Sequence, residues 1–348
     1  MITCTSPGAA LAFRYRRGGL HLPRLGLWLD ATRSVKRPER AFVSHAHADH
    51  VARHEEVIAS LATARFLQAR LGGKRTEHLL PFGETRAFDH GEAPYRLTLL
   101  PAGHILGSAM ARVEAEGETL LYTGDFQLRP SPAAERCRPC PADLLVMETT
   151  FGRPEYCFPP RPEVWDAVVR FCHETLSGGG TPVLLGYSLG KSQELLLGLA
   201  ESRLRLAVHP QIQKLTVEYE HLGRSFPPYE LLDAQTPRGC VVLCPPSAAR
   251  SPWLHRLKPI RSAVVTGWAI DPRCRYRYGV EAAFPLSDHA DFPDLLRMVE
   301  QVAPRQVFTC HGFAADFAAT LRERGVEAWA LGEADQLTLP LGWPEVRA

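Results

Sequence analysis

The first 150 residues alternate short apolar runs with turns rich in glycine, proline and charged residues, a pattern typical of β-strands. A helix is predicted over Ala62–Leu71, where Gly72-Gly73 ends it, and another is expected to follow the histidine-rich segment near residue 50. This part of the chain is therefore predicted to be β-rich. The runs predicted as strands are Leu25–Leu29, Ala41–Ser44, Tyr95–Leu100, Ala109–Glu114, Thr119–Thr123 and Leu144–Met147.

From about residue 151 the pattern changes to strands that alternate with helices. An amphipathic helix is predicted to begin at Arg161 and to end at Gly178-Gly179-Gly180, because apolar positions recur there at helical spacing. Such alternation implies a parallel sheet, so this segment is predicted to form a second, smaller α/β unit. The further predicted elements are strands Val183–Tyr187, Leu204–Val208, Cys240–Leu243 and Ala263–Thr266, and helices Lys191–Ala200 and Ile212–His221.

Near Asp288 the pattern changes again. Asp291 is predicted to cap a helix with Pro293 in its first turn, and strand Val307–Cys310 with helix Phe313–Arg324 completes a final βα unit. The pattern therefore divides the chain into residues 1–150, a second unit over residues 151–284, and residues 285–348.

Composition adds little to this picture, since 348 residues with a net charge of +2 give no overall electrostatic signature of a nucleic-acid partner. Any basic surface must be local. Nine cysteines, an odd number spread along the chain, indicate reduced thiols and a cytoplasmic location. No apolar run approaches the ~20 residues of a membrane span, and no membrane partner is expected.

The segment Ser44-His45-Ala46-His47-Ala48-Asp49-His50 carries the strongest chemical signal. In an extended chain alternate residues face one way, so His45, His47 and Asp49 are predicted to converge on one point while His50 faces a neighbouring one. Imidazole and carboxylate suit zinc or another first-row divalent ion. The segment therefore predicts a metal site.

Three further candidate ligands each follow an apolar strand: His104 in Pro101-Ala102-Gly103-His104, Asp125 after Tyr122-Thr123-Gly124, and His311 in Cys310-His311-Gly312. Together with the first segment they supply two ions, zinc being expected and manganese the alternative. One ion takes His45, His47, His104 and Asp125, and the other takes Asp49, His50, His311 and the shared Asp125. Two ions ~3.5–4 Å apart clamp the attacking and leaving oxygens in phosphodiester cleavage.

These motifs resemble those of the metallo-β-lactamase superfamily, and the rest of the chain resembles its β-CASP nucleases. The resemblance covers nearly the whole chain and implies an αββα sandwich with an inserted β-CASP α/β domain, so that residues 1–150 and 285–348 form one discontinuous domain. It rests on His45–His50, His104 and Asp125, on Glu148 in Met147-Glu148-Thr149-Thr150, on His289 in Leu286-Ser287-Asp288-His289, on His311, and on Tyr187-Ser188-Leu189-Gly190-Lys191-Ser192-Gln193-Glu194 inside the insert.

Within that family the chain is most similar to the bacterial DNA-ligase-associated exonucleases, through its short insert, Glu148–Pro154 and Gly267-Trp268-Ala269. This resemblance implies a single-strand DNA exonuclease of DNA repair, with an operon-linked DNA ligase and helicase as partners. Eukaryotic DNA-specific members tend to lack a histidine at the third motif, whereas RNA-processing members keep it. Because His311 is present, an RNA-processing nuclease remains the alternative.

Catalytic roles follow from the histidine left over once both sets of metal ligands are filled. His289 is the candidate general acid for the leaving sugar oxygen, and Glu148 is the candidate carboxylate that holds its ring. Asp49 and Asp125 are expected to act in catalysis through the metals. A structural histidine is the alternative interpretation of His289.

Two segments are candidates for nucleic-acid contact. Lys191 begins a predicted helix after a strand, where phosphate can bind, although a plain turn with a solvated lysine explains it equally. Cations interleave with aromatic rings in the second segment, as in grooves that bind single strands, and a solvated charged hairpin is the alternative. Its members are Trp268, Arg273, Arg275, Tyr276 and Arg277.

Other function classes explain less of the sequence. Hydrolysis of a small thioester or lactam would use the first ligands but leaves the insert, His289 and the basic turn unexplained. A catalytically inactive nucleic-acid-binding subunit would lose ligands, whereas every ligand position here is filled. Cys137 and Cys140 have zinc-pair spacing without a second pair, so they are expected to lie in a loop as two thiols.

Overall fold

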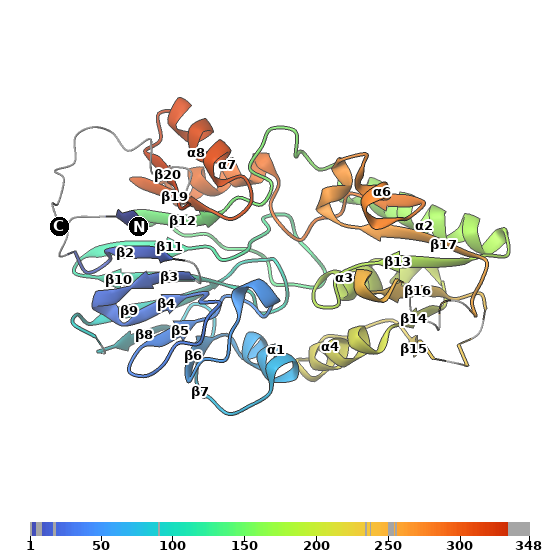
Figure 1. The fold of residues 1–348 in the computed structure, drawn as a ribbon, viewed down its shortest axis with the longest axis horizontal. Helices are drawn as coiled ribbons and strands as arrows, with labels where there is room; N and C mark the ends of the chain where they lie inside the picture. The colour runs from blue at the N-terminus through green and yellow to red at the C-terminus, as the bar shows by residue number, and fades with distance from the viewer. Residues whose placement is uncertain are drawn as a thin grey trace.

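The computed structural model describes residues 2–4, 9–16, 19–89, 91–233, 235–236, 238–249, 254 and 256–332. It shows two lobes, with the strands up to β12 and the C-terminal elements in one and strands β13 to β18 in the other (Figure 1). Residues 333–348, predicted from the sequence to belong to the first domain, lie outside the described residues.

The first lobe contains two seven-stranded sheets. One sheet follows chain order through β1 (Ile2–Cys4), β2 (Phe13–Arg16), β3 (Gly19–Leu22), β4 (Leu27–Leu29), β5 (Arg40–Phe42), β6 (Glu56–Ala59) and β7 (Thr76–Leu79). The other has the order β20 (Ala328–Ala330), β19 (Gln306–Cys310), β12 (Leu144–Glu148), β11 (Glu118–Tyr122), β10 (Ala109–Ala115), β9 (Tyr95–Pro101) and β8 (Thr85–Phe88). The C-terminal elements therefore complete a sheet begun before the interruption.

The alternation of side chains along β10 shows how the two sheets pack. Ala111 and Val113 lie in the core between the sheets, whereas Met110 points the other way, into a core covered by helices. Phe42 on β5 packs edge-to-face on Tyr122 on β11, with ring centroids 6.4 Å apart. Both faces of the second sheet are therefore buried.

Helices cover the outer faces of both sheets. Helix α1 (Leu61–Leu71) buries Phe66 and Leu67 with apolar residues of β6. Helices α7 (Phe292–Val302) and α8 (Ala314–Glu323) cover the second sheet, and Asp291 caps α7 by accepting a hydrogen bond from the Asp294 N–H. The layers agree with the predicted α/β sandwich of the metallo-β-lactamase fold.

The second lobe is a six-stranded sheet whose paired strands are all parallel. Its strands, in sheet order, are β15 (Tyr229–Leu231), β14 (Leu206–Val208), β16 (Val241–Cys244), β13 (Thr181–Leu185), β17 (Ile260–Val265) and β18 (Ala282–Phe284). Its helices are α2 (Arg161–Ser177), α3 (Lys191–Gly198), α4 (Pro210–His221) and α6 (Cys274–Tyr278). Strands alternating with helices produce this parallel sheet, as expected.

The two lobes contact each other directly through α1 and α4. The Phe66 ring of α1 lies 5.0 Å from the Tyr219 ring of α4, and the Tyr219 hydroxyl accepts a hydrogen bond from the Leu106 N–H at 3.4 Å. Because Phe66 and Tyr219 are both fully buried, the second lobe is packed against the first rather than merely tethered to it.

Several predicted elements were wrong or absent. No α-helix follows the histidine-rich segment: a single 3₁₀ turn covers Ala48–His50, and the Glu55 N–H then donates to the Val35 carbonyl, which leads the chain into β6. The strand predicted from Leu25 begins at Leu27, after a 3₁₀ turn over Pro23–Leu25. The short strands at the sheet edges were not predicted. Among the described helices, none is long and apolar enough to cross a membrane.

Candidate metal centre

The predicted ligands lie at one edge of the first lobe, because each follows the carboxyl end of a strand. His45 comes shortly after β5, His104 after β9, Asp125 after β11 and His311 after β19. Gly124 allows this approach, since its φ is 52° and a Cβ there would lie 2.6 Å from the Ser44 side chain. The carboxyl ends of these strands therefore build one site from distant parts of the chain.

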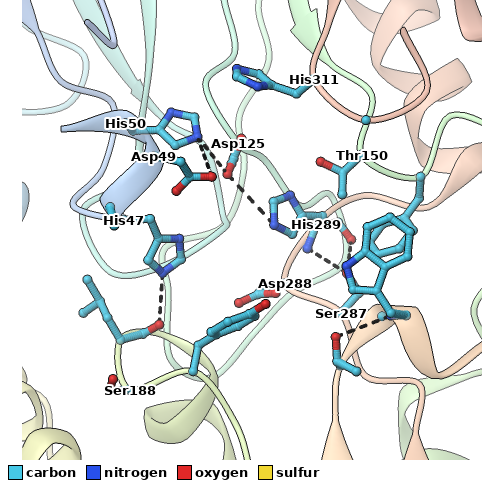
Figure 2. Close-up of a pocket in the computed structure, with 18 of the residues that line it drawn as sticks. His47, Asp49, His50, Asp125, Thr150, Ser188, Ser287, Asp288, His289 and His311 are labelled. Carbon is cyan, nitrogen blue, oxygen red and sulfur yellow. Dashed lines mark hydrogen bonds and ion pairs between the residues drawn. The ribbon is translucent and has the colours of Figure 1, made fainter. Parts of the chain in front are cut away.

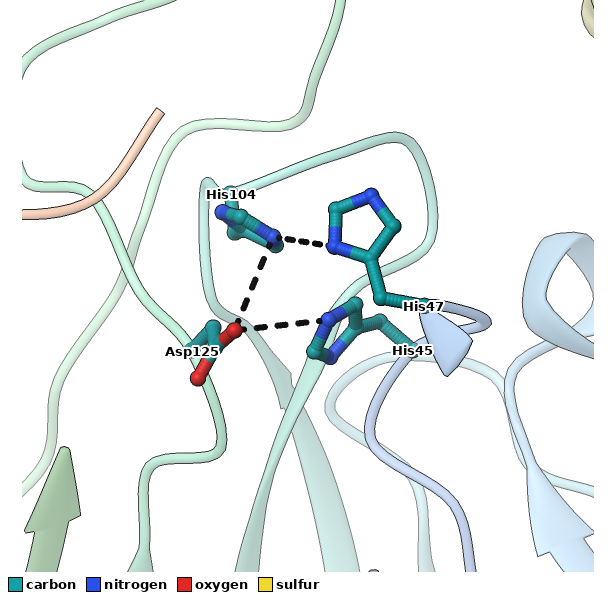
Figure 3. A group of neighbouring side chains, drawn as sticks. All are labelled: His45, His47, His104 and Asp125. Atoms are coloured by element: carbon teal, nitrogen blue, oxygen red, sulfur yellow. Dashed lines mark hydrogen bonds and ion pairs between the residues drawn. The ribbon is translucent and has the colours of Figure 1, made fainter. Parts of the chain in front are cut away.

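His45, His47, His104 and Asp125 form the first group, with all four ligand atoms within 4.8 Å of one another (Figure 3). The Asp125 Oδ2 atom lies 3.5 Å from His45 Nε2 and 3.8 Å from His104 Nε2. His45 Nε2 is buried without a hydrogen-bond partner in the described residues. A buried nitrogen left in this way, facing two other imidazoles and a carboxylate, fits a divalent cation.

The protonation states of these histidines also suit a metal. Burial lowers the pKa of His45 well below its ordinary value, lowers that of His47 to about 4, and lowers that of His104. Neutral imidazoles are the form that coordinates metal ions. The first group of the predicted ligand set is thus brought together in a state that can bind.

The side chains of the second predicted group lie farther apart than those of the first. His50 Nε2 lies 3.3 Å from Asp125 Oδ2 and 4.0 Å from Asp49 Oδ2, and the His311 ring centroid is 5.4 Å from that of His50. The Asp49 side chain is 78% exposed and lies outside the first group, so the expectation that it converges with His45 and His47 was wrong. The reason is the 3₁₀ turn, which breaks the alternation of an extended chain.

His311 reaches the site through an unusual backbone conformation. Its φ is 59°, a left-handed value that favours glycine, and the Thr149 hydroxyl donates to its carbonyl at 2.7 Å. Gly312 follows with a φ of 57°, and a Cβ there would lie 2.4 Å from Thr150 Cα. The backbone conformation at residues 311 and 312 therefore sets where this ring can lie.

Asp30, which was not predicted from the sequence, holds this edge together. Its carboxylate accepts hydrogen bonds from the Ser44 N–H and hydroxyl and from the Tyr122 hydroxyl, and it pairs with His50 Nδ1 at 2.8 Å. Burial alone would lower the pKa of His50, but Asp125 and Asp30 raise it well above its ordinary value. The sequence signal for Asp30 is its position directly after the apolar run that forms β4.

Two ligand rings are fixed by carbonyl groups from other segments. His47 Nε2 lies 3.1 Å from the Leu189 carbonyl oxygen in the second lobe, and His104 Nδ1 lies 2.8 Å from the Asp288 carbonyl oxygen. Such bonds leave His47 Nδ1 and His104 Nε2, 3.0 Å apart, facing Asp125. The orientation of the His47 ring thus depends on the second lobe, and that of the His104 ring on the segment just before α7.

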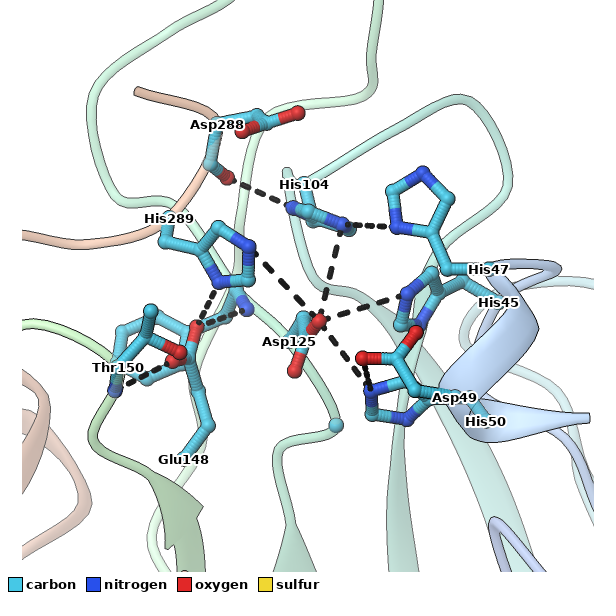
Figure 4. A network of polar contacts seen from close by, with 12 residues as sticks. His45, His47, Asp49, His50, His104, Asp125, Glu148, Thr150, Asp288 and His289 are labelled. Atoms are coloured by element: carbon cyan, nitrogen blue, oxygen red, sulfur yellow. Dashed lines mark hydrogen bonds and ion pairs between the residues drawn. The ribbon is translucent and has the colours of Figure 1, made fainter. Parts of the chain in front are cut away.

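His289 and Glu148 lie beside the first group (Figure 4). His289 Nδ1 is 2.9 Å from Glu148 Oε1, and its Nε2 is 3.9 Å from Asp125 Oδ2. Glu148 also accepts from the N–H groups of Phe126 and Thr150. Burial would lower the pKa of His289, but the charges of Glu148 and Asp125 outweigh it and raise the pKa to about 10. The predicted pairing of the two side chains is present.

A cleft of about 490 Å³ lies over these groups, between the two lobes (Figure 2). His50, His289 and His311 line it from the first lobe, and Ser188 and Trp268 line it from the second. A substrate in this cleft would therefore contact both lobes.

The predicted nucleic-acid contacts differ in accessibility. Arg273 and Arg277 are exposed, although both pair with Asp271, at 3.1 and 3.3 Å. Tyr276 is 76% exposed, and the Arg275 guanidinium lies 5.3 Å from its ring centroid. Arg275, Tyr276 and Arg277 lie in the short helix α6, which Arg273 precedes, whereas Trp268 lies in a 3₁₀ turn over Gly267–Ile270, so the segment is not a hairpin.

Lys191 does not have the placement expected of a phosphate contact. Its side chain is 1% exposed, and its Nζ donates to Glu194 Oε2 at 2.6 Å. Arg161 also contacts Glu194, whose other oxygen accepts from the Ser131 hydroxyl. Lys191 is therefore part of a buried charge network between the lobes, which leaves the predicted phosphate contact without structural support.

The cysteine pair is not part of a metal group in the described residues. Cys137 is buried, and burial raises its pKa to about 12, while Cys140 is partly buried in the same apolar core. Every cysteine whose side chain is described is a free thiol.

Comparison with known proteins places the chain among metal-dependent hydrolases. Residues 278–331 match a family described as "Zn-dependent metallo-hydrolase RNA specificity domain". The chain is similar to a "Probable DNA ligase" of Opitutus terrae, with 55% identity over 333 residues, which is 95% of this chain and 32% of that protein. Among the solved structures that it resembles is that of a protein of unknown function from Enterococcus faecalis V583, with a TM-score of 0.54, 13% identity, and coverage of 78% of this chain and 75% of that chain.

Two further relatives match smaller parts of the chain at lower identity. The chain is 36% identical over 153 residues to an endoribonuclease ysh1 of Aspergillus fumigatus, covering 41% of this chain and 17% of that protein. It is 32% identical over 195 residues to the transcription termination factor FttA of Methanothermobacter thermautotrophicus, covering 47% of this chain and 31% of that protein. The chain thus spans about a third or less of these curated relatives. With the metal groups above, these similarities establish that the chain belongs to the β-CASP nuclease family of the metallo-β-lactamase superfamily.

Proposed function

We propose that the protein hydrolyses nucleic-acid phosphodiester bonds with two divalent metal ions, and that it acts as an exonuclease on single-stranded DNA. The observation that carries this proposal is the group of His45, His47, His104 and Asp125, with His50 and His289 also beside Asp125 at the base of a cleft. An ion-binding site alone would suit many hydrolases. The combination with a paired histidine and a second lobe suits cleavage of a polymer.

The metal ligands proposed for the first ion are His45, His47, His104 and Asp125, and those for the second are Asp49, His50, His311 and Asp125. Zinc fits the first group best, because three imidazoles and a carboxylate match its preferred ligands; manganese is the alternative. When bound, two such ions supply Lewis acidity for an in-line displacement at phosphorus.

His289 is proposed as the general acid. Its Nδ1 is held by Glu148 at 2.9 Å, which leaves Nε2 directed toward the side of the cleft where Asp125 lies. A protonated Nε2 can donate to the leaving sugar oxygen, a contribution of about 10²–10⁴-fold for a well-placed acid. Glu148 acts through His289 by keeping the ring charged and oriented.

Residues 151–284 are proposed to be the β-CASP domain, inserted into a metallo-β-lactamase domain formed by residues 1–150 and 285–348. The parallel sheet β13–β18 and its packing on α1 support this assignment. The cleft lies between the two units and has aromatic residues such as Trp268 in its lining. A cleft covered in this way suits one strand with unstacked bases better than an intact duplex.

The choice of DNA rests on the relative whose printed name is a probable DNA ligase, since the match covers 95% of this chain. From this relative and from the resemblance in the sequence, we propose a role in DNA repair alongside a DNA ligase and a helicase, in the cytoplasm. Ribonuclease activity is the second candidate, which the endoribonuclease relatives, the RNA specificity match over residues 278–331 and the presence of His311 favour.

The deciding experiment is an assay of the purified protein, loaded with zinc or manganese, on single-stranded DNA and matched RNA labelled at either end. The proposal predicts that DNA is shortened stepwise from its 5′ end and that the His289→Ala variant shortens it about 10²–10⁴-fold more slowly. Much faster degradation of RNA would replace the DNA proposal with the ribonuclease one. Failure to cleave either polymer would contradict both.

A further inference from the structure

One arginine lines the cleft although it belongs neither to the proposed metal ligands nor to the predicted nucleic-acid-binding segment at α6. Arg70 is the one lysine or arginine among the described residues that line the cleft, where the acidic side chains are Asp49, Asp125 and Asp288. It lies in the last turn of α1. A cation there favours the helix dipole, but that explains only its position on the helix and not why its side chain lines the cleft.

The guanidinium of Arg70 has no hydrogen bond or ion pair to another described residue, while the charge of Asp49 acts on it. Burial lowers its pKa from the ordinary value, since the side chain is partly enclosed. Other arginines near this edge are engaged: Arg65 on the same helix pairs with Glu218 at 3.7 Å, and Arg75 donates to Glu77 at 2.8 Å. Arg70 thus keeps its donors available to a ligand in the cleft.

Tyr187 lines the same cleft from the second lobe. Among the described residues it is one of the few large hydrophobic side chains that are exposed, with 52% of its surface accessible. Partial burial and the neighbouring Tyr278 hydroxyl raise the pKa of its own hydroxyl to about 12, and Asp288 and Asp49 act in the same direction more weakly. Arg70 and Tyr187 therefore line the same cleft as Asp49, from opposite lobes. A guanidinium and an exposed ring offer a phosphate and a nucleobase their respective contacts.

We infer that Arg70 and Tyr187 form a subsite for one nucleotide of a single strand, next to the scissile phosphodiester on the Asp49 side of the cleft. Arg70 binds the internucleotide phosphate, and Tyr187 stacks on the base. This inference rests on the proposed nuclease function and adds to it two side chains of the cleft lining that are not among the proposed metal ligands. The near-neutral net charge of the chain is then compatible with strand binding, because the cations that matter are local.

The test compares Arg70→Ala with Arg70→Lys and with Arg65→Ala, a control on the same helix whose guanidinium pairs with Glu218 and does not line the cleft. The probe for binding is a fluorescent single-stranded oligonucleotide of deoxythymidines, and its affinity is measured over a range of salt concentrations. Arg70→Ala is expected to weaken binding about 10-fold, the value of one charge-assisted contact. Its log–log salt slope is expected to fall by about 0.7, because one phosphate of a single strand is no longer neutralised.

A second readout separates the subsite from an effect on the metals. The ratio of kcat/KM for the oligonucleotide to kcat/KM for the nitrophenyl ester of thymidine monophosphate should fall about 10-fold in Arg70→Ala, because the small ester has no second phosphate. Arg70→Lys should recover part of the binding, and Tyr187→Phe should bind more tightly than Tyr187→Leu. Equal decreases on both substrates would show that Arg70 acts through Asp49 and would overturn the inference.

The nuclease function and the subsite can fail separately. If the wild-type protein cleaves the oligonucleotide and Arg70→Ala binds and cleaves it as Arg65→Ala does, the subsite is refuted while the nuclease function stands. If the wild-type protein hydrolyses the small ester but neither binds nor cleaves DNA or RNA, both the nuclease function and the subsite are refuted.

Discussion

His47 Nε2 lies 3.1 Å from the carbonyl oxygen of Leu189, so a candidate metal ligand of the first lobe is hydrogen bonded to the backbone of the second. Gly190, the next residue, has a φ of 88°, and a Cβ there would lie 2.2 Å from the side chain of Ile105. This close approach requires glycine. The position of the second lobe and the orientation of the His47 ring are therefore linked.

The buried charge network of Lys191, Arg161 and Glu194 gives a first prediction. Glu194 is 2% exposed and compensates the charges of Lys191 and Arg161, so Glu194→Ala should lower stability by about 3–5 kcal/mol, as expected when one partner of a buried pair is removed. Because α3 then shifts relative to His47, zinc affinity should also fall by about 10-fold. Thermal unfolding and zinc titration by calorimetry measure the two effects.

The matched control for this prediction is Glu201→Ala, at an exposed position shortly after α3. It should leave the melting temperature and zinc affinity at wild-type values. A Glu194→Ala variant that unfolds earlier but binds zinc with undiminished affinity would show that lobe docking and ligand orientation are independent.

His289→Ala should separate chemistry from binding. Because His289 is paired with Glu148 and stands outside the two proposed ligand sets, the variant should keep its metals and its affinity for DNA while cleavage falls about 10²–10⁴-fold. A nitrophenyl diester, whose leaving group needs no proton, should be hydrolysed at a rate much closer to that of the wild type. Loss of metal, measured by elemental analysis, would instead identify His289 as a ligand.

Glu148→Gln tests the positioning role in the same assay. Glutamine can still accept the hydrogen bond from His289 Nδ1 but no longer supplies the charge that raises the pKa of the ring. Cleavage of DNA should fall, and the pH above which activity declines should move to lower values. An unchanged pH profile would leave Glu148 with a purely structural role.

The arginines at α6 should contribute unequally to the binding of single-stranded DNA. Arg273 and Arg277 share Asp271, whereas Arg275 lies over the exposed Tyr276 ring, so Arg275→Ala should weaken single-strand binding more than Arg277→Ala. Replacing both Arg275 and Arg277 should lower the log–log salt slope by roughly 0.7 for each phosphate that these arginines neutralise. Equal slopes in the double variant and the wild type would show that these arginines do not contact the strand.

The sequence predicted the layers of the fold well because strong periodicity marks buried elements. The helices α2, α4 and α7 and the strands β9 to β12 lie where their apolar patterns place them. Short edge strands such as β7 and β15 were missed, since a few half-exposed residues carry no clear alternation. The helix expected after His50 failed because tertiary hydrogen bonding to Val35 decides the backbone there.

The candidate site, too, could be predicted from the sequence only in part. His45, His47, His104 and Asp125 could be predicted as a group, because each side chain stands at a strand end and ligand chemistry is specific. Asp30 and the Leu189 carbonyl could not, because their roles arise from contacts between segments distant in sequence. Lys191 shows the opposite error: a motif at a helix start looked accessible, yet packing between the lobes buries it.

The central claim is that two ions sharing Asp125 carry out phosphodiester cleavage at the base of the cleft. The most direct test adds zinc or manganese stepwise to chelator-stripped protein and follows bound metal and single-stranded DNA cleavage together. The two-ion mechanism predicts about two bound equivalents, cleavage that appears with the second, and loss of both ions' tight binding in Asp125→Ala. Full cleavage with one equivalent, or with none, or an Asp125→Ala variant that keeps wild-type binding, would contradict it.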